Sequence, residues 1–180
     1  MNNLKKSLTG LTLAAGALLS ATAWAAPQLL HASQTVDIAA APDRVWDLVK
    51  HYSDLTWVPL VKSSASTKGN TIGSVRTLDL GGPKLTEELV KYNAQGHSYT
   101  YAIQNTADNQ KVVPLSDVKA TISIAPGKNG GSLVTWQAEF HRADHADAPA
   151  AGRDDAAAQG TMGGVITAGL GGLKAKAEAL

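Results

Sequence analysis

Alternation of apolar and polar residues, interrupted by turn-forming residues, divides most of the chain into short strands. A first strand is predicted over Ala32–Ile38, where Val36 and Ile38 share one face. Glycine-rich turns are predicted at Gly81–Lys84 and Gly127–Gly131. The remaining strands are predicted over Val61–Thr67, Ile72–Leu80, Leu85–Tyr92, His97–Gln104, Asp117–Ile124 and Ser132–His141. The pattern therefore indicates an antiparallel sheet of about seven strands.

Two short helices are predicted after the first strand. Pro42 suits the first helical position, where its missing N–H costs nothing, and Asp43 complements the positive end of the helix dipole. Ser53-Asp54 resembles the cap of a second short helix, which Pro59 ends. The apolar stripe of the first of these helices consists of Val45, Trp46 and Val49.

A long helix is predicted from about Asp154 to Leu180, after a polar loop over Ala143–Arg153. Six glycines lie between Gly160 and Gly172, and each costs about 1 kcal/mol against alanine inside a helix. Apolar residues nevertheless recur at helical spacing. The glycines are expected to thin one face of the helix, either for close approach to a sheet or above empty space. The stripe consists of Met162, Ile166, Leu170, Leu173 and Ala177.

Several segments of the chain resemble one protein superfamily. The stretch AAPDRVWDLVKHYSDLTWVP resembles the opening of SRPBCC proteins, which include START, Bet v 1 and polyketide cyclase-like proteins. The segments GSVRTLDL, TEELVKYN, YTYAI, PLSDVKATISI and LVTWQAEF resemble its polyketide cyclase/dehydrase branch in order and spacing. The resemblance implies an α+β helix-grip (Bet v 1-like) fold, a curved antiparallel sheet around the long C-terminal helix. It implies little about function, because the fold hosts carriers, enzymes and regulators.

The first 25 residues have the pattern of a signal peptide. Lys5 and Lys6 precede an uncharged, mostly apolar run over Ser7–Thr22, and Ala23-Trp24-Ala25 is a small-x-small cleavage motif. A transmembrane anchor is the alternative, but a run this short and rich in Ala, Gly and Thr spans a bilayer poorly. We expect cleavage between Ala25 and Ala26, export to the periplasm, and one domain over residues 26–180.

Charge and composition exclude several kinds of partner. The whole chain has 16 basic and 15 acidic residues, and loss of two leader lysines leaves 14 against 15. Without a dense Lys/Arg run, no nucleic-acid partner is expected. The chain has no cysteine, which excludes disulfides, thiol nucleophiles and Cys-ligated metals. No motif for a cofactor or for nucleophilic catalysis occurs, so no cofactor and no catalytic residue are assigned.

The hairpin around Gly81–Lys84 carries two charged residues on its apolar face. Arg76 and Glu87 are expected to lie diagonally on that face, each the partner of the other, because buried charges need partners. Three roles stay open for them: a structural ion pair, an anchor for a ligand head group, or an acid/base pair. The predicted register pairs Leu80 with Leu85, Leu78 with Glu87 and Arg76 with Leu89.

An internal cavity is expected between the sheet and the long helix. A chain with one phenylalanine and many alanines and glycines fills that space poorly, and ligand pockets are mostly apolar with a few polar groups. A small hydrophobic ligand is the expected occupant, with a core role as the alternative for each lining residue. The predicted lining consists of Arg76, Leu78, Glu87, Leu89, Tyr99, Tyr101, Trp136, Phe140, Met162, Ile166 and Leu170.

Three weaker signals remain. Trp57, beside Pro59, is either a core residue or a partner-binding residue at the cavity mouth. The potential metal ligands between His141 and Asp147 leave a strand and enter a loop, where histidines four apart do not converge, so no metal site is expected. The uncharged stretch 156–173 contains a GxxxG motif, but its amphipathic spacing favours packing on the sheet over membrane insertion.

The leader and the domain together resemble exported, single-domain accessory proteins of methanol oxidation, the MxaD type. That resemblance implies a non-enzymatic binding role in the periplasm, with methanol dehydrogenase and a cytochrome c as partners. The alternative is a carrier of a small hydrophobic molecule, or a polyketide cyclase-like enzyme, that uses the internal cavity.

Overall fold

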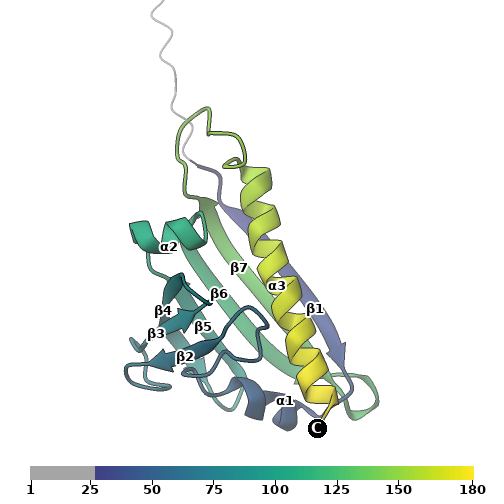
Figure 1. Cartoon of the computed structure of the whole chain (residues 1–180). Coiled ribbons are helices and arrows are strands. Elements are labelled where there is room, and N and C mark those ends of the chain that lie inside the picture. Colours follow the sequence, from purple (N-terminus) through teal and green to yellow (C-terminus); the bar gives the residue numbers. More distant parts are fainter. Residues whose placement is uncertain (1–26) are drawn as a thin grey trace, which may run out of the picture.

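Seven antiparallel strands form one curved sheet, and a long helix crosses its inner face (Figure 1). The computed structural model describes residues 27–180, so the predicted leader and cleavage site lie outside the described residues. The strands lie in the order β1-β7-β6-β5-β4-β3-β2. Their bounds are β1 Leu30–Ile38, β2 Ser63–Ser66, β3 Val75–Asp79, β4 Lys84–Asn93, β5 Ser98–Ile103, β6 Leu115–Pro126 and β7 Ser132–Arg142. This arrangement is the predicted helix-grip fold.

Within residues 27–180, three α-helices accompany the sheet: α1 over Pro42–Val49, α2 over Ala107–Val112 and α3 over Asp155–Glu178; a short 3-10 helix, η1, spans Lys128–Gly130. As predicted, α1 begins at Pro42 and the long helix occupies the C-terminus. The Asp154 carboxylate caps α3 by accepting a hydrogen bond from the Ala157 N–H at 2.8 Å. Within residues 27–180, no helix is both long and apolar enough to cross a membrane.

The prediction of a second short helix before Pro59 is wrong. Separate four-residue turns replace it, closed by hydrogen bonds from the Asp54 N–H to the His51 carbonyl and from the Val58 N–H to the Leu55 carbonyl. Helix α2, by contrast, was not predicted. Its buried Asn109 accepts a hydrogen bond from the Thr86 N–H of β4, so a tertiary contact stabilises this short helix.

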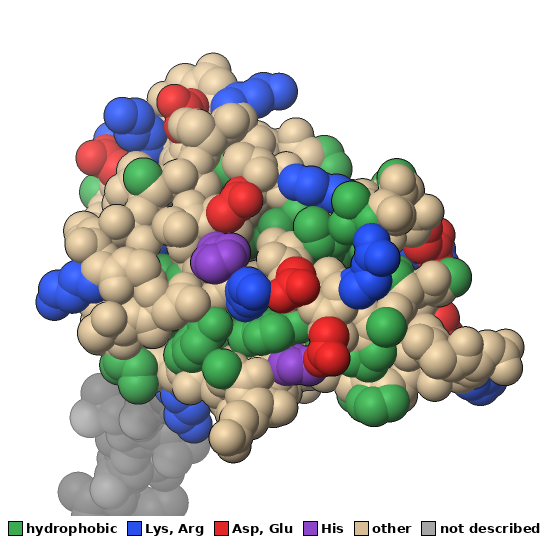
Figure 2. All heavy atoms as spheres, turned by 90° about the horizontal axis from the view of Figure 1, so that it is seen from below, with side chains coloured by type: hydrophobic (Ala, Val, Ile, Leu, Met, Phe, Trp, Pro, Cys, Tyr) green, Lys and Arg blue, Asp and Glu red, His purple; other side chains and the backbone are tan. Residues whose placement is uncertain are grey.

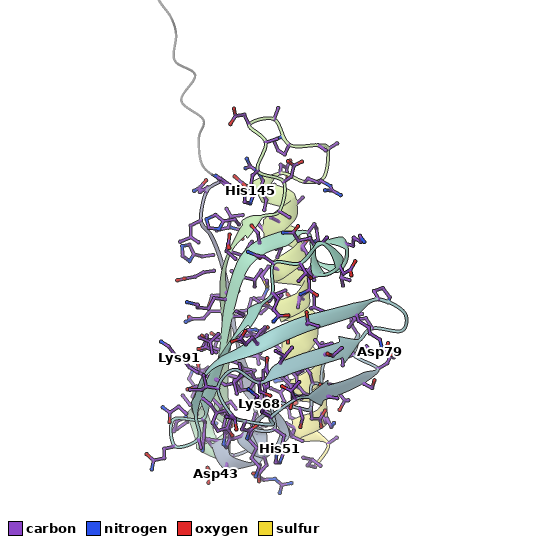
Figure 3. All side chains as sticks on the ribbon, turned by 90° about the vertical axis from the view of Figure 1, so that its left-hand side faces the viewer. Asp43, His51, Lys68, Asp79, Lys91 and His145 are labelled. Atoms are coloured by element: carbon purple, nitrogen blue, oxygen red, sulfur yellow. The ribbon has the colours of Figure 1, made fainter. Side chains whose placement is uncertain are left out.

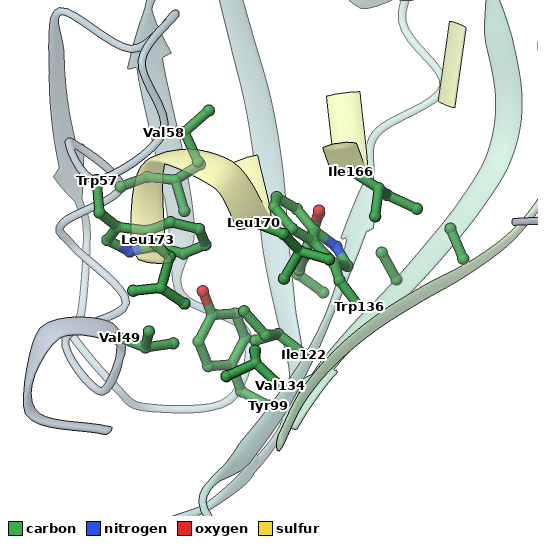
Figure 4. Close-up of a cluster of buried hydrophobic side chains, with 14 of the residues drawn as sticks. Val49, Trp57, Val58, Tyr99, Ile122, Val134, Trp136, Ile166, Leu170 and Leu173 are labelled. Carbon is green, nitrogen blue, oxygen red and sulfur yellow. The ribbon is translucent and has the colours of Figure 1, made fainter. Parts of the chain in front are cut away.

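The core lies between α3 and the inner face of the sheet (Figure 4). The whole predicted stripe of α3 is buried, and Tyr99, Ile122 and Val134 face it from the sheet. At Gly169 a Cβ atom would clash with the Trp136 ring, and at Gly172 with the Trp57 carbonyl and the Pro59 ring. These two glycines therefore allow the predicted close approach. The other glycines of α3, Gly160, Gly163, Gly164 and Gly171, have open space around them.

The end of the molecule that carries α1 and the C-terminus has a mixed surface. Acidic, basic, histidine and hydrophobic side chains are interspersed there (Figure 2). Asp47 and Lys50 form an ion pair of 2.6 Å on α1, and Lys174 and Glu178 form one of 3.2 Å on α3. This end therefore presents charges of both signs side by side.

Candidate functional site: a cavity beside a buried ion pair

The β3–β4 hairpin sets Arg76 directly opposite Glu87. The predicted register was wrong by two residues, because the turn occupies residues 80–83, closed by a hydrogen bond from the Leu80 N–H to the Pro83 carbonyl. Gly81 and Gly82 both have positive φ angles, which glycine adopts without steric cost. Since side chains alternate with a period of two, the slip leaves every residue on its predicted face.

Arg76 and Glu87 form an ion pair inside the protein. The Nε and Nη2 groups of Arg76 donate to Oε2 of Glu87 at 3.0 and 2.5 Å, and Nη1 donates to the Tyr52 carbonyl at 3.1 Å. Arg76 has no exposed surface and Glu87 is 3% exposed. Burial, the largest single influence, disfavours the Arg76 cation, but the Glu87 carboxylate together with Tyr99 and Tyr52 outweighs it, so the pKa of Arg76 is raised above its ordinary value.

Tyrosine rings enclose the guanidinium group. Its Cζ atom lies 4.2 Å from the Tyr52 ring centroid and 5.5 Å from that of Tyr101, distances at which cation–π attraction operates. Tyr99 contacts Tyr52 edge-on, with 5.8 Å between ring centroids. Burial raises the pKa of Tyr99 and of Tyr101 above the ordinary value, so both hydroxyls stay protonated at neutral pH. The ion pair and the three tyrosine rings form a buried polar cluster.

A cavity of about 80 Å³ adjoins this cluster. It lies between α3, the segment Leu55–Val61 and the β3–β4 hairpin, and of the residues that the structure describes Glu87 is the one charged residue that lines it. Leu60 is 58% exposed and marks the side on which the cavity approaches solvent. The lining consists of Leu55, Val58, Leu60, Val61, Leu78, Leu80, Leu85, Glu87, Tyr101, Ile103, Val113, Trp136, Met162 and Val165.

The structure divides the predicted lining into two groups. Five of the predicted residues line the cavity: Leu78, Glu87, Tyr101, Trp136 and Met162. The other six are buried in the core and do not line it: Arg76, Leu89, Tyr99, Phe140, Ile166 and Leu170. Strand parity predicts the face of a side chain, but the distance along the strand decides whether α3 covers it. Sequence reasoning missed the segment Leu55–Val61, because it was assigned partly to a helix.

Trp57 is a core residue, so its expected role as an exposed partner-binding residue is corrected. It is 3% exposed and contacts Trp136 edge-on, with 5.6 Å between ring centroids (Figure 4). The close approach of Gly172 to the Trp57 backbone holds the segment against α3. A buried indole offers no surface to a partner.

The histidines near the end of β7 have separate partners. Nδ1 of His141 lies 3.5 Å from the Asp117 carboxylate, and Nε2 of His145 lies 3.0 Å from the Ser116 hydroxyl. Figure 3 shows His145 at the opposite end of the molecule from Asp43. Among residues 27–180, no group of three His, Asp or Glu side chains is arranged to hold a metal ion.

A larger hollow, of about 250 Å³, lies on the outer face of the sheet. Its lining includes Lys91, Lys119 and Glu139, all exposed, and the hydroxyls of Thr100 and Thr121, which bond to each other at 2.8 Å. Lys91 lies on the side of the sheet away from α3 (Figure 3). Because these polar groups are solvated or already paired, we place the candidate site in the smaller, apolar cavity.

The fold and the cavity together define a helix-grip protein of the ligand-binding type. A family model described as polyketide cyclase / dehydrase and lipid transport matches residues 30–178. The chain therefore belongs to this family. None of the curated proteins matches the chain.

Solved structures of bacterial proteins share the fold. An uncharacterised protein from Bacillus thuringiensis is 27% identical, with a TM-score of 0.68 over 82% of this chain and 98% of its own. The protein XoxI from Bacillus cereus is also 27% identical, with a TM-score of 0.67 over 81% of this chain and 94% of its own. A protein from Nitrosospira multiformis, at 17% identity and a TM-score of 0.64 over 82% and 95% of the two chains, shows the fold alone.

Proposed function

We propose that this protein is an exported, non-enzymatic binding protein that holds a small apolar ligand in the cavity beneath α3. The observation that supports this best is the cavity itself, which has an almost wholly apolar lining and one charged residue. Arg76 already neutralises that charge, so an apolar ligand meets no uncompensated charge there. Export to the periplasm is part of the proposal and rests on the leader pattern of residues 1–25.

The cavity has the size of a small ligand. An apolar cavity of about 150 Å³ in another protein stays dry and takes up benzene. The present one, of about 80 Å³, suits a smaller molecule, or one whose far end lies beside the exposed Leu60. Burial of apolar ligand surface contributes about 25 cal/mol per Å², which supplies the binding energy.

Native mass spectrometry of the protein isolated from the periplasm tests this proposal, together with thermal unfolding in the presence of small apolar compounds. We expect a bound small mass and ligand-dependent stabilisation. Val165→Phe places a ring in the cavity and should abolish both. Gln159→Phe adds the same ring at an exposed position of α3 and should abolish neither. A wild-type protein that carries no mass and responds to no compound contradicts the proposal.

A second candidate follows from the resemblance of the exported domain to MxaD-type accessory proteins. In this role the protein would assist electron transfer from methanol dehydrogenase to a cytochrome c. The family match over residues 30–178 supports the shared domain, and the leader pattern supports the shared compartment. The rate of cytochrome reduction by methanol dehydrogenase, measured with and without the protein, tests this role. An unchanged rate contradicts it.

A further inference from the structure

We propose that the ligand of the cavity is an uncharged molecule whose hydroxyl group donates a hydrogen bond to Glu87, and that carboxylates are excluded. This inference rests on the proposed function and deepens it by stating the chemistry of the ligand. It comes from the uneven use of the two carboxylate oxygens of Glu87.

Within the described part of the chain, only one oxygen of the Glu87 carboxylate accepts hydrogen bonds. Both guanidinium hydrogen bonds end on Oε2, and none of the residues 27–180 donates a hydrogen bond to Oε1. Glu87 is 3% exposed, and it lines the cavity. An anionic oxygen that accepts no hydrogen bond from the protein has lone pairs free for a ligand donor, and a bond to a charged acceptor is stronger than one between neutral groups. A hydroxyl on the ligand supplies the donor.

Arg76 cannot serve as the ligand anchor. All three nitrogens of its guanidinium group donate hydrogen bonds within the protein, Tyr52 and Tyr101 flank the group, and no part of the side chain is exposed. The cavity therefore presents a carboxylate to its ligand and no cation. A ligand carboxylate would meet like charge in an apolar setting, where charges interact strongly.

A cationic ligand is disfavoured as well. Arg76 and Glu87 together have no net charge, so a cation in the cavity would bring one uncompensated charge into an apolar space. A neutral hydroxyl gives Oε1 its donor without that cost. The cavity volume of about 80 Å³ limits the buried part of the ligand to a few carbon atoms.

Three compounds of matched size test the inference: 1-butanol, its isomer methyl propyl ether, and butanoate. The ether has the same atoms as the alcohol but no donor, and butanoate is an anion. Binding is followed by NMR through the indole N–H signal of Trp136, which lines the cavity. The indole N–H of Trp46 is the internal reference, because this α1 residue packs against Tyr92 and His97 and does not line the cavity.

We expect 1-butanol to bind at least tenfold more tightly than the ether, as one hydrogen bond to a charged acceptor allows, and butanoate to leave the Trp136 signal unmoved. Equal affinity of the two isomers within twofold, or binding of butanoate, overturns the inference and leaves the proposed function standing. If neither neutral isomer shifts the Trp136 signal, even when each is added up to its solubility limit, the inference and the proposed function both fail.

Variants link the preference to Glu87. In the double variant Arg76→Met/Glu87→Leu, which removes both charges together, the ratio of the two affinities should fall below twofold. Glu88→Gln, which alters the neighbouring carboxylate on the opposite face of β4, should keep the full ratio. A double variant that folds and still prefers the alcohol tenfold contradicts the role of Glu87. If the double variant does not fold, the comparison of the two isomers in the wild-type protein still decides whether the ligand donates a hydrogen bond.

Discussion

The two halves of the inner face of the sheet are covered by different parts of the chain. Helix α3 lies across β7 and β1, where Gly169 brings it into contact with the Trp136 ring (Figure 1). Over β3 and β4 the segment Leu55–Val61 forms the cover together with Met162 and Val165 of α3, and the cavity lies among them. The first half is closely packed where Gly169 meets Trp136, whereas the cavity and the buried ion pair lie toward the second half, with the Trp136 ring at the boundary.

The difference shows how one sheet can hold both a core and a binding site. A helix with glycines at its contact positions approaches closely and excludes space. A segment of separate turns follows the sheet less closely, and the space left over is lined by leucine, valine and one paired carboxylate. The buried charges of Arg76 and Glu87 lie on the side where side chains leave the interior incompletely filled.

The largest expected effect comes from breaking the ion pair on the cavity side. Glu87→Leu leaves the Arg76 cation buried without a partner, and we expect a loss of about 3–5 kcal/mol in the free energy of unfolding. The double variant Arg76→Met/Glu87→Leu should recover most of this, to within about 1 kcal/mol of the wild type. Urea denaturation of the three proteins measures both values. A single variant as stable as the double one would mean that the pair is not buried as described.

A smaller loss is expected on the solid side. Gly169→Ala places a Cβ atom against the Trp136 ring, so the ring or α3 must shift, and overpacking of this kind costs about 1–3 kcal/mol. The gain in helix propensity offsets about 1 kcal/mol of this. Thermal unfolding measures the result. A stabilised Gly169→Ala protein would show that α3 can lift from the sheet without cost.

The smallest effect has the opposite sign. Gly164→Ala is the same substitution on the same helix, at an exposed position with open space around the missing Cβ. We expect stabilisation by about 0.5–1 kcal/mol from helix propensity alone. The same thermal measurement serves as the check, with Gly169→Ala as its matched contrast. Destabilisation by Gly164→Ala would show that this face of α3 needs its glycine for a contact outside the chain.

Local patterns predicted the elements well where alternation or helical spacing was strong. The first helix at Pro42, the seven strands and the buried stripe of α3 are all confirmed. Failures occurred where the structure depends on contacts distant in sequence. The turns before Pro59 carry a cap-like Ser-Asp pair yet form no helix, and α2 forms because Asn109 bonds to β4.

The candidate site was predictable in composition but not in position. Strand parity identified Arg76 and Glu87 as buried partners even with the register wrong, because a slip of two residues preserves the face. It could not separate Glu87, which lines the cavity, from Tyr99 or Leu89, which share its face and lie in the solid core. That separation depends on where α3 and the segment Leu55–Val61 lie above the sheet.

The amino-acid sequence by itself determined the order of the elements, the face on which each strand residue lies, and the need of two buried charges for each other. These follow from periodicity and from the cost of burying charge, which act over a few residues. Only the tertiary structure decided that Trp57 is buried, that two of the α3 glycines are contacts, and that the cavity opens beside Glu87. Such outcomes depend on how distant segments fill a shared volume, and close packing is a property of the assembled interior.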